Sequence, residues 1–455
     1  MKAYPCDENM ASSRKLWAIV LLLLLQACSS KQPPFNIIHI TADDLGYGEL
    51  GSFGQTLVHT PNLDQLAAEG MRFTQHYAGS SLCNPSRYAF MTGKHAGSTG
   101  IVTNRSNILP ADTFTIAKLM QNGGYYTGII GKWALGSASS SGAPLKQGFD
   151  YFFGYPNQVS AHNYYPEKLL ENDNEISLEG NVISENFNIA LEKKVYAPYL
   201  IHQKSLAFLE RNRNRKFYLQ LDYNLPHVNN ELQSITANGF EHPGIGRYSD
   251  EDWSPAEKGY AEMISLMDDY IGELVWKLRS LGVANKTLII FTSDNGPSGV
   301  RGVKSLQLFN ATGGLKGMKG MLFEGGIRVP MIAWWPGTIP GNTICTNTTT
   351  FWDVMPTLAE LIGYQQAMEA DGESFANTLR GVSQKSTRRT LYWEVNDRKA
   401  IRHGSWKWVH HPMKKKSEFL YNIVEDPREL NNLAAKAPEK LAQLQALAER
   451  YATIQ

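Results

Sequence analysis

The stretch Ser80-Ser81-Leu82-Cys83-Asn84-Pro85-Ser86-Arg87 places a cysteine, a proline and an arginine at alternate positions, just before a run that favours a helix. One interpretation is a buried free thiol beside a helix N-terminus, which is the usual fate of an isolated cysteine. The other is a reactive position. A five-residue pattern supports the second interpretation only if the rest of the chain supplies matching surroundings.

Polar side chains follow two apolar runs that are predicted to be buried strands. Asp43 and Asp44 come after residues 35–40, and Asp294 and Asn295 come after residues 286–292. Ligands of open α/β sheets gather where strands end, although adjacent acids more often only solvate a turn. Oxygen ligands suit hard divalent cations, and a flexible shell of many oxygens favours Ca²⁺ over Mg²⁺. No cysteine and histidine spacing typical of a zinc site is present.

Strand-like and helix-like segments alternate along the first 362 residues, which indicates a mainly parallel sheet covered on both faces. Between them, residues 149–199 are rich in aromatic and polar residues and are predicted to be a long functional loop. The predicted strands are 35–40, 71–77, 125–130, 217–223, 286–292 and 331–335, and the predicted helices are 60–70, 113–122, 259–281 and 352–362.

The pattern changes after residue 362. Four short strand-like runs, within residues 390–422, precede a helical pattern over residues 438–454. This order predicts a small four-stranded antiparallel sheet with one packed helix. We therefore expect a catalytic domain over residues 35–362 and a C-terminal α+β subdomain over residues 363–455.

Composition limits the choice of partners. The chain has 455 residues, with 44 Lys and Arg against 43 Asp and Glu, so its net charge is +1. No overall field would attract nucleic acid, which we do not expect as a partner, but a local basic pocket could still bind an anionic sugar. The four cysteines, Cys6, Cys28, Cys83 and Cys345, each have a separate explanation, so no disulfide is expected.

The N-terminal region resembles a targeting segment. Two basic residues precede an apolar run over residues 16–25, which is shorter than the about 20 residues that a membrane-spanning helix needs. The run ends near Cys28 in a sequence similar to a bacterial lipobox. We expect a signal peptide over residues 1–28, lipidation of Cys28 with membrane attachment, and a periplasmic or membrane-anchored bacterial lipoprotein. Simple secretion stays open, because Gln26 is unusual in that pattern.

Together, the motifs resemble those of the type I sulfatases of the alkaline phosphatase superfamily, in particular bacterial arylsulfatase A-like enzymes that act on sulfated carbohydrates. The resemblance covers nearly the whole chain after the targeting segment. It implies an alkaline phosphatase-like sandwich, in which a large mixed and mainly parallel sheet lies between helices, plus the small C-terminal subdomain. The matching segments are residues 42–48, 83–87, 131–133, 226–227, 293–296, 319–320, 324–328 and 420–427.

The resemblance also implies a reaction. A maturation enzyme would oxidise Cys83 to formylglycine, whose gem-diol attacks the sulfur of a sulfated saccharide and then releases the sulfate. One Ca²⁺ would be held by the oxygen ligands together with the modified Cys83. The implied metal ligands are Asp43, Asp44, Cys83, Asp294 and Asn295.

Four basic residues receive roles from the same resemblance. Arg87 and Lys132 would orient the diol, although surface ion pairs are the commoner fate of such residues. His227 and Lys319 would face the bridging oxygen. We expect His227 to be the general acid, because the ordinary pKa of histidine lies near neutral pH.

Two positions depart from the family pattern. Ala134 stands where many members have a histidine that contacts the diol, and Asn84 stands where Ser or Thr is usual. Two alternatives stay open. One is a phosphate or phosphonate ester hydrolase, because relatives in the same superfamily share the metal site and differ in nucleophile and charge balance. The other is a sugar-binding relative that has lost catalysis, which Ala134 alone supports.

Sugar recognition is assigned to the segment after residue 149. His162, Asn163 and Tyr164 combine rings that can stack on sugars with an amide that can bond hydroxyls. Packing of this segment against the scaffold is the alternative.

Overall fold

A computed structural model describes residues 35–105, 107–185, 187–244, 246–299, 305–382, 389–412 and 417–452. The expected signal peptide and Cys28 lie outside the described residues. From Asn36 onward the chain forms one compact unit. Among the described helices, none combines the length and the apolar character that crossing a membrane requires.

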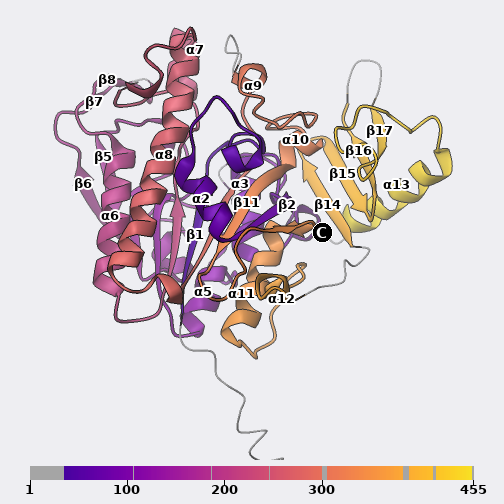
Figure 1. Cartoon of the computed structure of the whole chain (residues 1–455), viewed down its shortest axis with the longest axis horizontal. Coiled ribbons are helices and arrows are strands. Elements are labelled where there is room, and N and C mark those ends of the chain that lie inside the picture. Colours follow the sequence, from indigo (N-terminus) through magenta and orange to yellow (C-terminus); the bar gives the residue numbers. More distant parts are fainter. Residues whose placement is uncertain are drawn as a thin grey trace, which may run out of the picture. The chain divides into compact units, whose positions relative to one another are not determined.

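A large mixed sheet of eleven strands forms the centre of this unit, in the order β12-β2-β11-β10-β1-β9-β3-β4-β5-β6, with β13 paired to β2 (Figure 1). The central strands β10, β1, β9, β3 and β4 run parallel, whereas β11, β5 and β6 pair antiparallel with their neighbours. The expected mixed, mainly parallel sheet is confirmed. The strands are β1 Asn36–Ala42, β2 Met71–Tyr77, β3 Tyr126–Lys132, β4 Tyr151–Tyr155, β5 Lys168–Glu171, β6 Asn174–Ser177, β9 Phe217–Asp222, β10 Thr287–Ser293, β11 Arg328–Trp334, β12 Thr343–Cys345 and β13 Thr349–Thr350.

Helices cover both faces of the sheet, as expected. On one face, Ile38 and Ile40 of β1 share a core with α2 (Pro61–Glu69), α6 (Ala197–Asn212) and α8 (Pro255–Ser280). On the other face, His39 stacks on Phe90 of helix α3 at 4.1 Å between ring centroids. Helix α3 (Cys83–Thr92) contacts α5 (Ile116–Asn122) and α11 (Val354–Ile362). The shorter helices are α4 Ala96–Thr99, α7 Asn230–Thr236, α9 Ser305–Leu308, α10 Glu324–Ile327 and α12 Ala376–Leu379.

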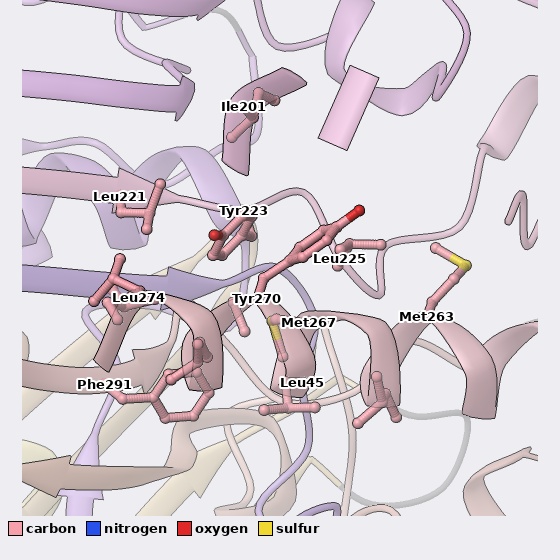
Figure 2. Packing of buried hydrophobic residues seen from close by; sticks show 14 of the residues in the cluster. Leu45, Ile201, Leu221, Tyr223, Leu225, Met263, Met267, Tyr270, Leu274 and Phe291 are labelled. Carbon is pink, nitrogen blue, oxygen red and sulfur yellow. The ribbon is translucent and has the colours of Figure 1, made fainter. Parts of the chain in front are cut away.

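Helix α8 shows why the first core forms. It starts at a capping box, in which the Ser254 side chain accepts from Glu257 N while the Glu257 side chain accepts from Ser254 N. Its residues at spacings of four and three positions line one face, which meets the apolar side chains of β9 and β10 (Figure 2). These helix residues are Met263, Met267, Tyr270 and Leu274.

A second sheet follows near the C-terminus. Strands β14 (Thr390–Val395), β15 (Arg398–His403), β16 (Trp406–His410) and β17 (Glu418–Asn422) pair antiparallel in chain order, and helix α13 (Pro438–Ala452) packs on them (Figure 1). The four-stranded sheet and its helix confirm the expected C-terminal elements. The domain boundary after residue 362 stays a prediction.

The expected long loop over residues 149–199 is wrong. This segment holds strands β4, β5 and β6 of the large sheet and a hairpin of β7 (Val182–Ile183) and β8 (Ala190–Glu192), and helix α6 begins near its end. Strands β5 and β6 are short, partly polar and lie at the edge of the sheet, so they lack the apolar run of the central strands. Strand β4 does carry an apolar run, and that run was not recognised as a strand.

A buried network of charges joins the two sheets. Lys407 of β16 donates to Glu324 Oε1 at 2.8 Å and lies 3.0 Å from Glu429 Oε1, and none of the three side chains is exposed. Burial opposes ionisation of Glu324, but Lys407 and Arg328 hold the pKa of Glu324 down at about 2. The segment between Lys316 and Arg328 is thereby fixed to the C-terminal sheet.

Replacing Lys407 by methionine is expected to lower the free energy of unfolding by about 3–5 kcal/mol, because Glu324 and Glu429 would remain buried without their cation. Urea denaturation measures this loss. Lys399→Met, on the neighbouring strand β15 and partly exposed, serves as the control. A loss below about 1 kcal/mol for Lys407→Met would show that the network is not structurally important.

Candidate active site

Two neighbouring strands bring three carboxylates together. In the parallel pair of β1 and β10, Ala42 lies opposite Ser293, so Asp43 and Asp294 leave the sheet side by side. Asp44 has a φ of 66°, a left-handed conformation that aspartate tolerates better than most residues. Its amide donates to Asp294 Oδ1 at 3.1 Å. The strand-end cluster predicted from the sequence is therefore present.

Asn295 completes this cluster. Its Nδ2 donates to Asp44 Oδ1 at 2.7 Å, whereas its Oδ1 is buried and has no hydrogen-bond partner in the described part of the chain. An amide oxygen without a partner, beside converging carboxylates, fits a ligand for a hard cation. The donor set thus agrees with the predicted calcium site.

Among the described residues, one group of potential metal ligands has all its donor atoms within 4.8 Å of one another, and it consists of Asp43, Asp44, Cys83 and His227. Asp294 and Asn295 border the group through their bonds to Asp44. His227 was not predicted as a ligand. Its Nε2 lies 3.1 Å from the Lys319 ammonium, which can only donate, so that nitrogen is already engaged as an acceptor.

Cys83 lies at the start of helix α3 and is 1% exposed. Its sulfur is 3.5 Å from Asp43 Oδ1 and 3.7 Å from Asp44 Oδ1. Burial, and then the charge of Asp294, raises the pKa of the Cys83 thiol well above its usual range. Because the thiolate is the nucleophilic form, an unmodified Cys83 is a poor nucleophile here.

Arg87 and Lys132 form buried ion pairs with the carboxylates of the cluster. Arg87 Nη2 lies 2.9 Å from Asp294 Oδ2, and its Nη1 lies 3.1 Å from Asp222 Oδ2. Lys132 Nζ donates to Asp43 Oδ2 at 2.6 Å and is fully buried. Both residues were predicted from the sequence, and the structure brings both to the cluster.

A glycine makes the approach of Lys132 feasible. Lys132 is the last residue of strand β3. The sequence had suggested that it follows the strand. Gly131, just before it, has a φ of 113°, and a Cβ atom there would lie 2.0 Å from the carbonyl oxygen of Asp222. Only glycine fits this close approach of β3 to β9.

The charges set the pKa values of the carboxyl groups. Burial alone would raise the pKa of Asp43, but Lys132 holds it well below its usual range, and Lys319 does the same for Asp44 against the effect of burial. The pKa of Asp294 is raised to about 7, by burial first and then by the charge of Asp43. Burial thus opposes ionisation of Asp294 more strongly than the nearby cations favour it.

Lys319 and His227 lie together beside Asp44. Lys319 Nζ donates to Asp44 Oδ2 at 2.7 Å and lies 3.1 Å from His227 Nε2. Burial, followed by the charge of Lys319, lowers the pKa of His227 to about 3, whereas the pKa of Lys319 is raised. A near-neutral pKa, the reason for expecting His227 as the general acid, is therefore wrong in this environment. Of the two side chains, Lys319 therefore carries the proton.

The three predicted sugar contacts lie next to this pair. The ring of His162 stacks on that of His227 at 4.9 Å, and its Nδ1 lies 3.2 Å from both carboxylate oxygens of Glu231. Tyr164 and Asn163 are fully buried, and the Tyr164 hydroxyl donates to the carbonyls of Asn224 and His227. Tyr164 thus supports the backbone of His227. Direct sugar contacts by the three residues remain predictions.

Asn84 and Ala134, which both depart from the family pattern, are in direct contact. Asn84 Nδ2 donates to the carbonyl oxygen of Ala134 at 2.6 Å, and Asn84 Oδ1 accepts from Asn107. Asn84 therefore binds the backbone at the position where many relatives have histidine. No pattern in the sequence indicated that these two positions are in contact.

Asp222 was missed. It ends strand β9 and holds Arg87 at 3.1 Å, and burial raises its pKa. The signal was available, because Asp222 also follows a buried apolar strand, as Asp43 and Asp294 do.

The fold and this cluster place the chain in the alkaline phosphatase-like class of enzymes. Residues 35–364 match the family model described as Sulfatase, and residues 317–454 match the model described as N-sulphoglucosamine sulphohydrolase, C-terminal. The chain belongs to the sulfatase family and is a sulfatase.

Relatives and solved structures agree with this assignment. Arylsulfatase A of Bos taurus is 34% identical over 86% of this chain and 77% of its own length. An N-acetylgalactosamine-6-O-sulfatase of Bacteroides thetaiotaomicron is 28% identical over 97% of this chain and 99% of its own length. The crystal structure of Ps i-CgsB in complex with k-i-k-neocarrahexaose superimposes with a TM-score of 0.78, at 25% identity, over 93% of each chain.

Proposed function

We propose that this sulfatase removes sulfate from a sulfated carbohydrate, using one Ca²⁺ and a formylglycine derived from Cys83. The observation that carries the proposal is the position of Cys83, buried 3.5–3.7 Å from two carboxylates with a thiol that burial keeps neutral. Such a thiol is a poor nucleophile, and conversion to formylglycine would supply the reactivity that the unmodified side chain lacks.

The metal would be held by Asp43, Asp44, Asp294 and Asn295, with the modified residue 83. When bound, Ca²⁺ supplies positive charge that attracts a sulfate oxygen and favours an ionised nucleophile. The buried, unpartnered Oδ1 of Asn295 supports this ligand set. Arg87 and Lys132 fix the carboxylates of Asp294 and Asp43 in their orientations from the buried side.

Formylglycine, when present, supplies a hydrated aldehyde with one hydroxyl for attack on sulfur and another for release of the sulfate. The chain itself supplies the proton for the departing sugar oxygen. Lys319 and His227 share a hydrogen bond of 3.1 Å beside Asp44, so they are placed to hold and deliver that proton together.

The names of one relative and of one solved structure support the proposed substrate class. The Bacteroides relative is named for a sulfated amino sugar, and the Ps i-CgsB structure contains a neocarrahexaose. We propose exo-action on a sulfated oligo- or polysaccharide. The comparisons do not favour the phosphate ester hydrolase or the sugar-binding relative without catalysis.

Two partners and a location belong to the same proposal. A maturation enzyme would convert Cys83 to formylglycine. The protein would be exported from a bacterial cytoplasm, and lipidation of Cys28 would attach it to a membrane. Mass spectrometry of the mature protein from its native host would test both, by detecting the aldehyde at residue 83 and the lipid at residue 28.

Parallel assays on 4-nitrophenyl sulfate and 4-nitrophenyl phosphate test the reaction type. The matured protein is expected to hydrolyse the sulfate ester with a kcat/KM at least about a hundredfold higher, because its centre is arranged for a single metal. A clear preference for the phosphate ester would contradict the proposal. Release of sulfate from N-acetylgalactosamine 6-sulfate and from carrageenan oligosaccharides would then narrow the sugar.

Removing the metal is expected to abolish sulfate release and to lower the melting temperature. Without the metal, the carboxylates of Asp43, Asp44 and Asp294 crowd one buried centre, and the raised pKa of Asp294 indicates that its ionised form is unfavourable there. Dialysis against EGTA, followed by Ca²⁺ or Mg²⁺, measures both effects. Recovery of activity and melting temperature with Ca²⁺ alone is expected, and unchanged activity in EGTA would contradict a calcium requirement.

A further inference from the structure

The turn between β14 and β15 has a fixed shape at the surface of the C-terminal sheet. Val395 pairs with Arg398, so Asn396 and Asp397 form a two-residue hairpin loop. Asn396 has a φ of 51°, the left-handed conformation that such loops require. Both loop residues are exposed. The turn therefore presents its side chains from a defined backbone.

One side of this turn contacts the segment next to Cys83. Asn396 N donates to the carbonyl oxygen of Val102 at 2.8 Å. Two residues further along that segment, Asn104 Oδ1 accepts from the amide of Asn84 at 3.0 Å. The turn is thus one short stretch of chain away from the start of helix α3.

The other side contacts the segment of Lys319. The Arg398 guanidinium donates through Nη1 to the carbonyl oxygen of Gly320, the residue after Lys319. Gly320 N in turn donates to the carbonyl oxygen of Ser81, two residues before Cys83. Arg398 therefore contacts the backbone at the point where the segments of Lys319 and Cys83 meet.

Gly320 uses only one of the three donor nitrogens of Arg398. Its side chain is 30% exposed, and its Nε is buried with no hydrogen-bond partner among the described residues. The nearest carboxylate oxygen, on Asp397, lies 3.9 Å from that Nε, which is too far for a hydrogen bond. The space beside the guanidinium is open on the side of Gly320, because glycine has no side chain. Even a Cβ atom at this position would lie 3.7 Å from Nη1.

We propose that Arg398 is a specificity-determining residue that binds a second anionic group, a sulfate or a carboxylate, on the saccharide beside the sulfate that is removed. The inference rests on the proposed sulfatase reaction and adds the substrate class, namely saccharides with at least two negative charges. A guanidinium suits this role because it stays charged and because an Nη donor that Gly320 does not use can bond an oxygen of a sulfate or a carboxylate.

Four substrates test the proposal on the matured full-length protein. They are 4-nitrophenyl sulfate, N-acetylgalactosamine 6-sulfate, N-acetylgalactosamine 4,6-disulfate, and the disaccharide in which N-acetylgalactosamine 6-sulfate is linked to a uronic acid. Each sugar is measured by its own kcat/KM or, if it is not cleaved, by its inhibition constant against 4-nitrophenyl sulfate. Every value is divided by that of the monosulfated sugar for the same protein.

The wild-type protein is expected to prefer at least one doubly charged sugar by about tenfold or more, because hydrogen bonds to charged groups contribute that much. Arg398→Ala should remove the preference, and Arg398→Lys should retain part of it. Lys399→Ala is the matched control, since it removes one positive charge from the next residue of the same strand and should leave the preference unchanged. A preference confined to the disulfate assigns a sulfate partner, and one confined to the disaccharide assigns a carboxylate.

Two results would overturn the proposal. One is a wild-type protein that does not distinguish singly from doubly charged sugars. The other is an equal loss on all four substrates in Arg398→Ala, which would mean that Arg398 only positions the Lys319 segment. A failure of the proposed reaction is separate, because the wild type would then hydrolyse no sulfate ester. In that case calorimetric binding of the three sugars to the wild type and to Arg398→Ala decides on Arg398 alone.

Discussion

Replacing Cys83 by alanine is expected to lower kcat for sulfate release by about four orders of magnitude or more, since removal of a catalytic nucleophile has effects of this size. The fold should survive, because only one buried sulfur atom is lost, at a cost of about 1 kcal/mol. Assays on 4-nitrophenyl sulfate and thermal unfolding followed by circular dichroism measure the two effects.

Cys345 provides the matched control. It is also buried, but it lies in strand β12, and its sulfur lies 4.0 Å from the Asn347 carbonyl oxygen. Cys345→Ala should retain full activity. Turnover near the wild-type level in Cys83→Ala, or an unmodified thiol at residue 83 in fully active protein, would refute the assignment of the nucleophile.

Cys83→Ser separates attack from release. A serine could accept the sulfuryl group, but it has no second hydroxyl on the same carbon to expel it. We therefore expect at most one turnover per molecule, visible as a burst of nitrophenol in rapid-mixing experiments. Sustained turnover by the serine variant would show that release does not need the modified side chain.

The second large effect is expected from Lys319→Met. Its ammonium contacts Asp44 and His227 at 2.7 and 3.1 Å, and loss of the proton donor should lower kcat on a sugar sulfate by about 10²- to 10⁴-fold. The loss on 4-nitrophenyl sulfate should be smaller, because nitrophenolate leaves readily without protonation. The ratio of the two losses distinguishes proton delivery from general damage to the centre.

His227→Ala tests whether the two residues act as a pair. If they deliver one proton together, the double variant should lose little more activity than either single variant. Lys286→Met, at an exposed lysine before strand β10, controls for the loss of a positive charge. Fully additive losses would contradict the shared role, and equal losses on both substrates would contradict proton delivery.

The sequence predicted the carboxylates of the site because Asp43 and Asp294 follow long apolar strands. Residues 36–42 and 287–293 are buried throughout, so the sheet had to bring Asp43 and Asp294 to one edge. The same rule would have found Asp222. Strands β5 and β6 could not be found in this way, because short strands at the edge of a sheet do not show an uninterrupted apolar run. Strand β4 has such a run and was overlooked.

Contacts between distant segments could not be predicted in the same way. Lys407 pairs with Glu324 across 83 positions, and neither residue stands in a pattern that marks it as buried. The lowered pKa of His227 also depends on burial and on Lys319, 92 positions away. Motifs identify which residues belong to the site, whereas packing decides their protonation and their partners.

If Cys83 is converted to formylglycine as proposed, its burial would also set an order of events in the life of the protein. Every residue of helix α3 is buried, and the carboxylates around the thiol come from segments about 250 positions apart in the chain. A maturation enzyme that binds the peptide around Cys83 could not reach it in the finished structure. Modification would therefore have to precede folding, while the segment is still extended, and a chain that folded first would remain permanently inactive.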